Sequence, residues 1–363
     1  MSSAMNADGL SAEQRGLRDA VRLLLGKRSD SAAVRRAITQ PAGYDEALWR
    51  VLCDQIGVAA LSVPEEFGGA GVGALETHLV LDELGRALTP APLLGSAVLA
   101  ARLLLASGDH DACSRLLPRI AEGDVVAVCW SGADGDWSTE PSAVTLAADG
   151  TLAGEAHYVL HGDTAAHLLV AASAPDGPVL VEVDPAQDAV VRQHTPTMDA
   201  TRRLARVAFE HARGTLLAAA DVPAALAEAR GAALVGQSAE QAGAMARLLE
   251  LTVEYAKVRV QFGRPIGSFQ AIKHRLADLH VLVEASRSAS YAAATGTVAP
   301  AVAAVHCAEA FFTVAAEAIQ LHGGIAITWE HDAHLYFKRA QAGTQLFGTP
   351  SVHLARLSEA VLG

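Results

Sequence analysis

The sequence predicts a mainly α-helical protein with a small antiparallel β domain in its middle. Apolar residues recur at helical spacing near both ends of the chain, and short β-rich runs fill the region between them. Aromatic residues make up only 5% of the 363 residues, so a core built from Ala, Leu and Val favours closely packed helices. The predicted domains are an N-terminal helical domain (1–124), a middle β domain (125–222) and a C-terminal helical bundle (223–363).

The N-terminal domain is predicted to be a bundle of several helices. Its helical periodicity runs from Ser11 to about Gly123. Segments rich in Pro and Gly interrupt it at 41–43, 64–73 and 90–92, where we expect the helices to end.

The middle domain is predicted to be a small antiparallel sheet. Asp149 and Gly150 between two β-rich runs are a hairpin signal, because this pair tolerates the tight turns that join neighbouring strands. The expected strands lie at 125–130, 143–146, 158–160, 168–171, 179–183 and 207–209.

The C-terminal domain is predicted to consist of long helices from Pro223 onward. We expect the pair Gly323 and Gly324 to end one of them at a left-handed cap. Small residues at 231–243 are compatible with a roomy pocket or with close helix packing, and we favour close packing.

Composition excludes several classes of function. The 28 Lys and Arg against 40 Asp and Glu give a net charge of −12, which argues against a nucleic-acid binder. No uncharged apolar run approaches the ~20 residues that cross a bilayer, and the first ten residues lack the pattern of an export signal, so we expect a cytoplasmic protein without a membrane segment. The four cysteines form no metal-binding or redox motif, and we expect them to be buried.

Two polar clusters carry the main functional signal. Arg259, Gln261, Phe262 and Gly263 stand in a break between two predicted helices. This cluster is compatible with a pyrophosphate site, because guanidinium groups bind phosphate oxygens, or with an ordinary polar turn. A second cluster about 60 residues later, at 320–325, places an amide and an imidazole beside two glycines.

Together these clusters resemble those of the acyl-CoA dehydrogenase family. Segments 61–71 (Leu-Ser-Val-Pro-Glu-Glu-Phe-Gly-Gly-Ala-Gly) and 81–86 (Leu-Asp-Glu-Leu-Gly-Arg) also resemble that family. The resemblance implies a C-terminal four-helix bundle and FAD at a subunit interface. It also implies removal of two hydrogens from an acyl-CoA thioester, in which a glutamate takes the α-proton and the flavin N5 accepts the β-hydride.

The resemblance assigns the cofactor contacts residue by residue. Arg259, Gln261 and Phe262 match residues that reach a neighbouring subunit's FAD. The other implied cofactor contacts are Ile266, Gln270, Gln320, Gly323, Gly324 and Thr349.

The departures from the family pattern concern catalysis. Phe347 occupies the usual position of the glutamate base, and Ala233 the alternative one, so no catalytic residue is assigned. Glu228, Glu240 and Glu250 lie on the same stretch but out of register, and we expect them on a solvated helix face.

The middle domain departs from the pattern as well. Segment 128–138 stands where active members carry Thr-Glu-Pro and Gly-Ser-Asp motifs, and Leu160 replaces a threonine expected to contact the flavin. Residues serving a neighbour's FAD are therefore kept, whereas those serving the chain's own flavin ring are lost. This asymmetry resembles the non-catalytic subunit of the heteromeric α2β2 acyl-CoA dehydrogenases of actinobacterial steroid degradation.

The resemblance implies a catalytic acyl-CoA dehydrogenase subunit as partner, or a tetramer of this chain, with an electron-transferring flavoprotein as acceptor. Two alternatives stay open: a self-sufficient homotetramer with an unusual base or substrate, and a flavin-free scaffold. No metal site is predicted. The pairs His157/His161 and His331/His334 are expected to be polar surface residues. Because 51% of the residues are hydrophobic, we expect the isolated chain to expose apolar surface.

Overall fold

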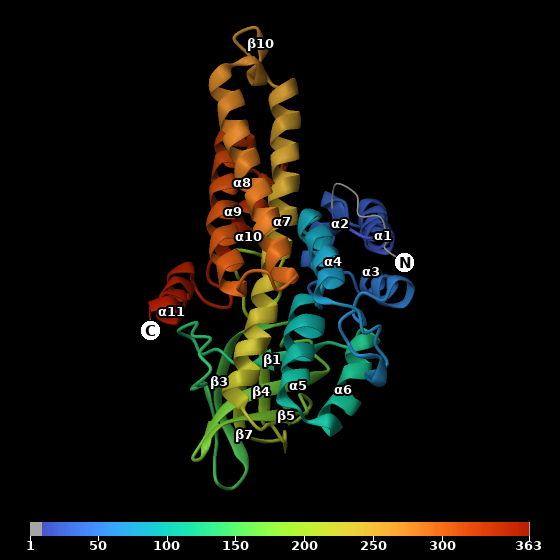
Figure 1. Ribbon diagram of the computed structural model, residues 1–363, viewed down its shortest axis with the longest axis vertical. Coiled ribbons are helices and arrows are strands. Elements are labelled where there is room, and N and C mark those ends of the chain that lie inside the picture. Colours follow the sequence, from blue (N-terminus) through green and yellow to red (C-terminus); the bar gives the residue numbers. More distant parts are fainter. Residues whose placement is uncertain (1–8, 363) are drawn as a thin grey trace.

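The computed structural model describes residues 9–362, and its N-terminal part is helical (Figure 1). Side chains of Ser11, Asp30, Asp45 and Asp109 cap four of the helices by accepting a hydrogen bond from the backbone N–H three residues later. The elements of this part are α1 (Ala12–Arg28), α2 (Ser31–Ile38), α3 (Glu46–Val51), η1 (Leu52–Ile56), η2 (Glu65–Phe67), α4 (Ala74–Arg86), η3 (Leu94–Ala100), α5 (Ala101–Ser107) and α6 (His110–Ala121).

The middle of the chain forms one largely antiparallel sheet, in which β2 and β3 make the hairpin predicted around Asp149 and Gly150. The exceptions are β1 and β2, which both run parallel to β4. The order is β6-β7-β3-β2-β4-β5-β8, with β1 beside β4. The strands are β1 (Val126–Cys129), β2 (Val144–Leu146), β3 (Thr151–Leu160), β4 (His167–Ala174), β5 (Gly177–Val183), β6 (Val190–His194), β7 (Leu204–Arg213) and β8 (Thr215–Leu216).

Long helices form the C-terminal part, in which α7 runs from the top of the molecule down to the sheet (Figure 1). The elements are α7 (Val222–Val258), β9 (Val260–Gln261), β10 (Arg264–Pro265), η4 (Ile266–Ser268), α8 (Gln270–Ala294), α9 (Pro300–His322), η5 (Gly323–Ile327), α10 (Ala333–Gly343) and α11 (Pro350–Leu362). Helix α9 ends at Gly323 as predicted, but the left-handed cap is wrong: Gly323 has φ 67° with ψ −150°, and a 3-10 turn follows.

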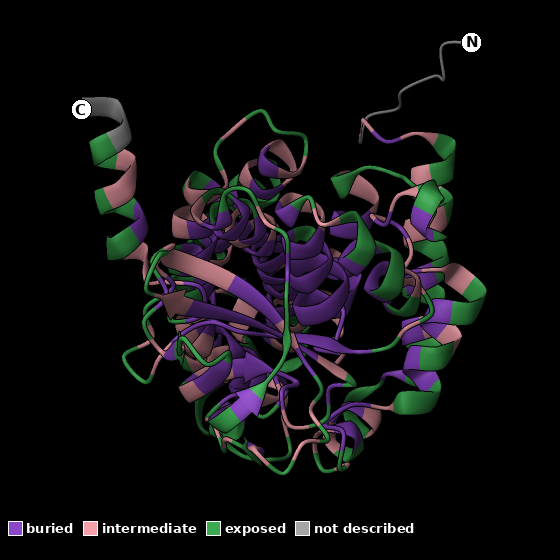
Figure 2. Ribbon diagram, turned by 90° about the horizontal axis from the view of Figure 1, so that it is seen from below, coloured by how far each residue is buried: buried purple, intermediate pink, exposed green. Residues whose placement is uncertain are grey.

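Helix α7 packs tightly against α4 at two glycines. A Cβ on Gly243 would lie 1.9 Å from the carbonyl oxygen of Asp82, and one on Gly85 would lie 2.0 Å from that of Glu240. Viewed from below, the middle of the molecule is mostly buried (Figure 2). Close packing therefore explains Gly243, whereas a Cβ on Gly231 would meet only Pro300 within 4 Å, at 3.6 Å.

One helix of the described chain is long and apolar enough to span a membrane, and it belongs to the C-terminal bundle. The stretch Pro300–Ile327 has the length and composition of a membrane span, yet 56% of its most apolar window is buried against other parts of the protein. All four cysteines are buried and free, as predicted.

Two of the four histidines expected at the surface are buried. His161 is 4% exposed and lies edge-on to Tyr44, and His334 is 6% exposed beside Trp329. The surface prediction is wrong for both. Tyr44, from a distant segment, packs against the ring of His161, and Trp329, five residues earlier in the chain, packs against that of His334.

Burial of histidines makes stability depend on pH. Burial lowers the pKa of His78 and of His161 from 6.5 to about 4. Between these values the unfolded chain binds protons that the folded chain does not, so stability should be full above pH 6.5 and fall as the pH drops toward 4. Urea unfolding at pH 7.5, 6.0 and 5.0 measures this effect. Below pH 6.5 the free energy of unfolding should fall by about 1 kcal/mol per pH unit for each of the two histidines. His161→Gln should flatten this slope, and equal stability at pH 7.5 and 5.0 would contradict the prediction.

Candidate functional site

The first predicted cluster lies at the tip of a projecting arm, residues 251–282, formed by the end of α7, the β9–β10 hairpin and the start of α8 (Figure 1). Arg259 and Gln261 are exposed, and Phe262 is 92% exposed with φ 53°. No acidic side chain of the described residues pairs with Arg259. The tip thus presents an unpaired guanidinium and an uncovered aromatic ring.

The base of the hairpin is held by local contacts. The Ile266 N–H donates to the carbonyl oxygen of Arg259 at 2.8 Å, and the Arg264 guanidinium lies over the Phe269 ring at 4.0 Å. Ile266 is half-buried, and Gln270 begins α8 with its side chain exposed. These contacts fix the backbone of the hairpin. The Gln261 amide nitrogen donates to the carbonyl oxygen of Val260 at 2.8 Å, whereas the Arg259 guanidinium has no acidic partner among the described residues.

The second cluster, the platform (Gln320–Gly324), lies at the end of α9 and is connected to the arm. The ring of His322 packs on that of Tyr255 in α7, with centroids 4.6 Å apart. Gln320, Gly323 and Gly324 are exposed around it. The structure therefore brings the two sequence clusters to the same end of the helical bundle.

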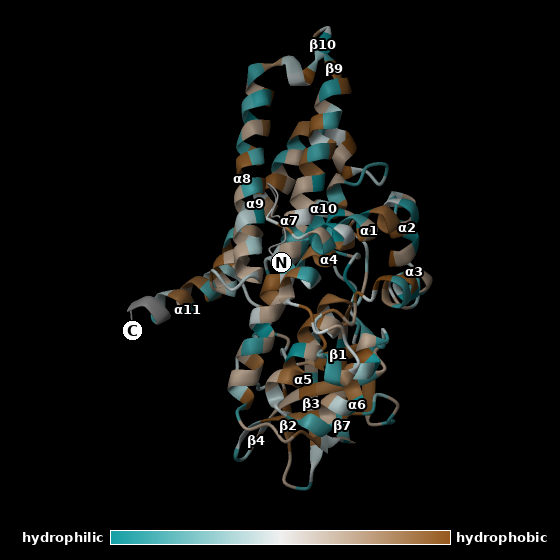
Figure 3. Ribbon diagram, turned by 45° about the vertical axis from the view of Figure 1, so that its right-hand side comes forward, coloured by the Kyte–Doolittle hydropathy of each residue, from teal (hydrophilic) through white to brown (hydrophobic). Residues whose placement is uncertain are grey.

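Apolar and cationic side chains extend the platform. Ile327 is 72% exposed and Trp329 is 65% exposed, and the cationic groups of Arg35 and Lys338 lie 5.5 and 4.8 Å from the Trp329 ring centroid. Phe262, Ile327 and Trp329 are among the large apolar side chains exposed in the described chain. Figure 3 shows how hydropathy varies along the arm and the bundle. Scattered apolar exposure is ordinary, but rings flanked by cations are typical of binding surfaces.

Phe347 occupies a different environment, an aromatic cluster inside the molecule. Its side chain is fully buried, its φ is 63°, and its ring lies 4.9 Å from that of Trp137, which in turn lies 5.6 Å from Trp130. Arg230 donates a hydrogen bond to the carbonyl oxygen of Trp137 at 2.5 Å and fixes this loop on α7. Thr349, two residues after Phe347, accepts a hydrogen bond from the Val352 N–H at the start of α11 (3.4 Å).

The other positions singled out for the chain's own chemistry are also filled. Ala233 is fully buried in the core. Leu160 packs closely on η3, where a Cβ added to Gly95 would lie 2.8 Å from the Cβ of Leu160. The cavity beside Leu160 measures about 10 Å³, roughly the room of one water molecule.

Of the three α7 glutamates considered as alternative bases, two pair with arginines near the surface and one is buried. Glu228 pairs with Arg102, and Glu250 with Arg86. Glu240 is only 9% exposed, so the prediction of a solvated face is wrong for it. Its Oε2 lies 2.5 Å from Arg202 and 3.2 Å from Arg339, and these two cations hold the carboxylate in an ion-pair network rather than leaving it as a free base.

Comparison with known proteins decides the family. A family model described as the acyl-CoA dehydrogenase C-terminal domain matches residues 224–362, and one described as the N-terminal domain matches residues 11–124. The chain belongs to the acyl-CoA dehydrogenase family. It is 43% identical over 353 residues to acyl-CoA dehydrogenase IpdE2 of Mycobacterium tuberculosis, covering 96% of this chain and 97% of that protein.

Solved acyl-CoA dehydrogenase structures include two similar complexes. A structure described as the Tcur3481-Tcur3483 steroid ACAD, G363A variant, has a TM-score of 0.87 and 29% identity, covering 96% of this chain and 98% of that one. The ChsE4-ChsE5 complex from Mycobacterium tuberculosis has a TM-score of 0.84 and 26% identity, covering 97% and 98%. The predicted fold is confirmed, and members of this acyl-CoA dehydrogenase family are FAD-dependent.

Sequence reasoning missed the residues that close the interior. Trp137 lies in a loop without periodicity, and Arg230 is one of several polar residues on a long helix. The available signals were indirect. The loop departs from the acyl-CoA dehydrogenase motifs, and two of the four tryptophans of the chain, at 130 and 137, lie in or beside it, as an apolar cluster would require.

Proposed function

We propose that this chain is the base-lacking, cofactor-completing subunit of a heteromeric acyl-CoA dehydrogenase. One observation carries the proposal. The position where the resemblance expects a glutamate is a phenylalanine buried against Trp137, whereas the tip of the arm is exposed and carries the unpaired guanidinium of Arg259. A benzyl group accepts no proton, and a positioned base contributes about 10²–10⁴-fold to such reactions. The partner subunit must therefore supply the base.

The residues at the tip suit the adenosine and pyrophosphate end of FAD. Arg259 offers a guanidinium with no acidic partner among the described residues, Gln261 offers an amide, and Phe262 offers a ring face for stacking. Gly263, at φ 74°, lets the backbone come close to a ligand. The proposal also assigns cofactor contacts to Ile266 and Gln270 on the arm and to Gln320, Gly323 and Gly324 on the platform. Thr349 lies apart from these residues, at the start of α11, and its cofactor contact rests on the resemblance alone. Bound FAD would supply hydride acceptance.

The chain's own interior fits a flavin ring poorly. Phe347 and Trp137 fill the space beside the expected base, and about 10 Å³ is left beside Leu160. We therefore assign FAD to the partner subunit, with one cofactor for each pair of unlike chains.

The proposal also names a substrate, an electron acceptor and a location. The substrate is an acyl-CoA thioester, and the description of one similar complex as a steroid ACAD favours a steroid-derived acyl group. An electron-transferring flavoprotein is the proposed acceptor and the cytoplasm the proposed location.

Co-expression tests the proposal. The chain should copurify with the acyl-CoA dehydrogenase-like protein encoded nearest to it, with one FAD per two chains. Arg259→Ala in this chain should weaken FAD retention by the complex by about tenfold, the effect of losing about 1.4 kcal/mol from a charge-assisted contact.

Arg275→Ala is the matched control, because Arg275 lies on the same arm but pairs with Glu317 at 3.6 Å. It should leave FAD retention unchanged. A homotetramer that binds one FAD per chain and bleaches with acyl-CoA would overturn the proposal in favour of a self-sufficient enzyme.

A further inference from the structure

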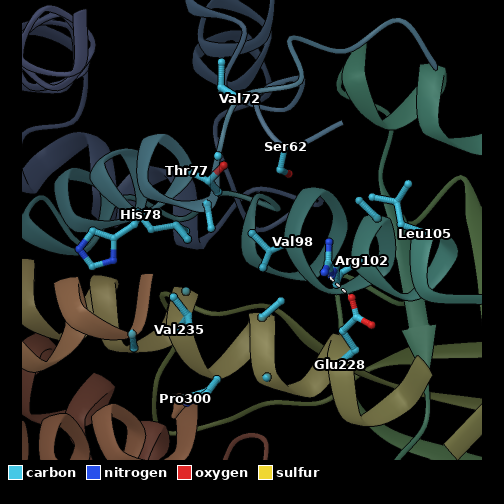
Figure 4. Close-up of a pocket in the computed structure, with 18 of the residues that line it drawn as sticks. Ser62, Val72, Thr77, His78, Val98, Arg102, Leu105, Glu228, Val235 and Pro300 are labelled. Carbon is cyan, nitrogen blue, oxygen red and sulfur yellow. Dashed lines mark ion pairs between the residues drawn. The ribbon is translucent and has the colours of Figure 1, made fainter. Parts of the chain in front are cut away.

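A cavity of about 560 Å³ lies between α4, α5 and α7, on a part of the molecule that the proposed function does not use (Figure 4). Its walls are mainly apolar and include Leu81, Val98, Leu105 and Val235. Pro300, at the start of α9, also lines it. This volume falls within the range of about 300–1,000 Å³ found for small-molecule sites.

The cavity lies on the opposite side of α7 from Phe347. Successive helical residues turn by about 100°, so Glu228, Ala232 and Val235 share one face, whereas Ala233 and Gln237 share a nearly opposite one. Gln237 on that opposite face donates to the carbonyl oxygen of Gly343 at 3.0 Å. The cavity is therefore separate from the region where the catalytic base is expected.

Polar groups lie at the two ends of the cavity (Figure 4). At one end Thr77 Oγ1 and His78 Nδ1 are buried without a hydrogen-bond partner among the described residues, and each residue is 6% exposed. Buried polar atoms are normally paired, so these two call for a partner from outside the chain. At the other end Arg102 and Glu228 form an ion pair and cancel each other's charge.

The chemistry at the Thr77 end suits an uncharged oxygen. Burial lowers the pKa of His78 to about 4, so its imidazole is neutral at pH 7 and has one donor and one acceptor nitrogen. A threonine in a helix has two accessible χ1 rotamers, and a rotation can turn Oγ1 toward the cavity. A charged group would lose its hydration there without gaining an opposite charge.

We propose that this cavity binds a neutral, mainly apolar small molecule that carries one hydroxyl or keto oxygen, with that oxygen at Thr77 and His78. The apolar body of the molecule lies along α5 and α7. The Arg102–Glu228 ion pair lies at the opposite end of the cavity, where the two charges cancel.

Three cage compounds of one shape test the ligand class: 1-adamantanol, adamantane-1-carboxylate and 1-adamantylammonium. Saturation-transfer NMR and calorimetry on the full chain, in the assembly in which it purifies, should show that adamantanol binds about tenfold more tightly than either ion. Equal binding of all three, or no saturable binding of adamantanol at its solubility limit, would overturn the proposal.

Gly231→Leu tests the location. Gly231 lines the cavity from α7, and a side chain there would occupy cavity space beside Pro300. This variant should weaken adamantanol binding at least tenfold. The matched control is Gly16→Leu in α1, where an added Cβ would meet nothing within 4 Å, and it should bind as the parent does. Equal loss in both variants would contradict the site.

Thr77→Val separates a binding role from a structural one. Replacing an unpartnered buried hydroxyl by a methyl group should leave the free protein equally or more stable, yet weaken adamantanol binding by about 2- to 12-fold. Unchanged affinity, or affinity lost together with stability, would mean that Thr77 does not contact the ligand.

Discussion

Phe347→Ala should destabilise the protein by about 3–5 kcal/mol, which would make this position a structural anchor. The Phe347 side chain is fully buried and packs on Trp137 at 4.9 Å, so its truncation leaves a cavity beneath the loop that Arg230 fixes on α7. Chemical denaturation followed by tryptophan fluorescence measures the loss, since Trp137 reports on the cluster directly.

Phe312→Ala is the control for this substitution. Phe312 lies on α9 with 37% of its surface exposed and is expected to cost about 1 kcal/mol or less. Equal losses at 312 and 347 would show that Phe347 is not an anchor.

Phe347→Glu tests the proposal that this chain lacks its own catalytic base. The new carboxylate would face the Trp137 ring in an apolar cluster, so we expect an unstable protein without acyl-CoA dehydrogenation. A stable variant that reduced bound flavin with an acyl-CoA would mean that the chain's own flavin site is competent and that the interpretation of Leu160 is wrong.

The long elements could be predicted from the sequence because their signals are local. Buried residues recur along the 37 residues of α7 and the 23 residues of α9, and Asp149 and Gly150 mark a tight hairpin. Strand β6 (Val190–His194) was not predicted. It pairs with β7 alone in the order of the sheet, and only Val190 of its five residues is buried, so its side chains carry no alternating pattern.

The interior of the candidate site could not be predicted in the same way, because it depends on contacts between distant segments. Trp137 meets Phe347 only when the middle domain docks on the C-terminal helices. Arg259 and Gln320 were found because their motifs lie in short, contiguous segments. The connection between those motifs through Tyr255 and His322 required the folded chain.

Glu240→Gln should cost about 3–5 kcal/mol, because it leaves two buried guanidinium groups short of a negative charge. Glu240 on α7 lies between Arg202 and Arg339, whose side chains are 9% and 8% exposed. Asp199 completes the network, with Oδ2 at 2.9 Å from Arg339 Nε. The network joins the middle domain to α7 and α10, so its loss should loosen the docking of the domains as well as lower the free energy of unfolding.

The control lies on the same helix. Glu250 pairs with Arg86 and Arg247 but is 44% exposed at its side chain, so Glu250→Gln should cost less than about 1 kcal/mol. Urea unfolding of both variants measures the difference, and limited proteolysis of the 195–203 turn reports on domain docking.

Similar small losses of unfolding free energy in the two variants would show that solvent reaches Glu240. That outcome would restore the solvated helix face expected from the sequence. A large loss for Glu240→Gln alone would instead tie this carboxylate to structure. Helix α7 would then hold no unpaired glutamate between Ala233 and Glu250 that could serve as a catalytic base, as the proposed function requires.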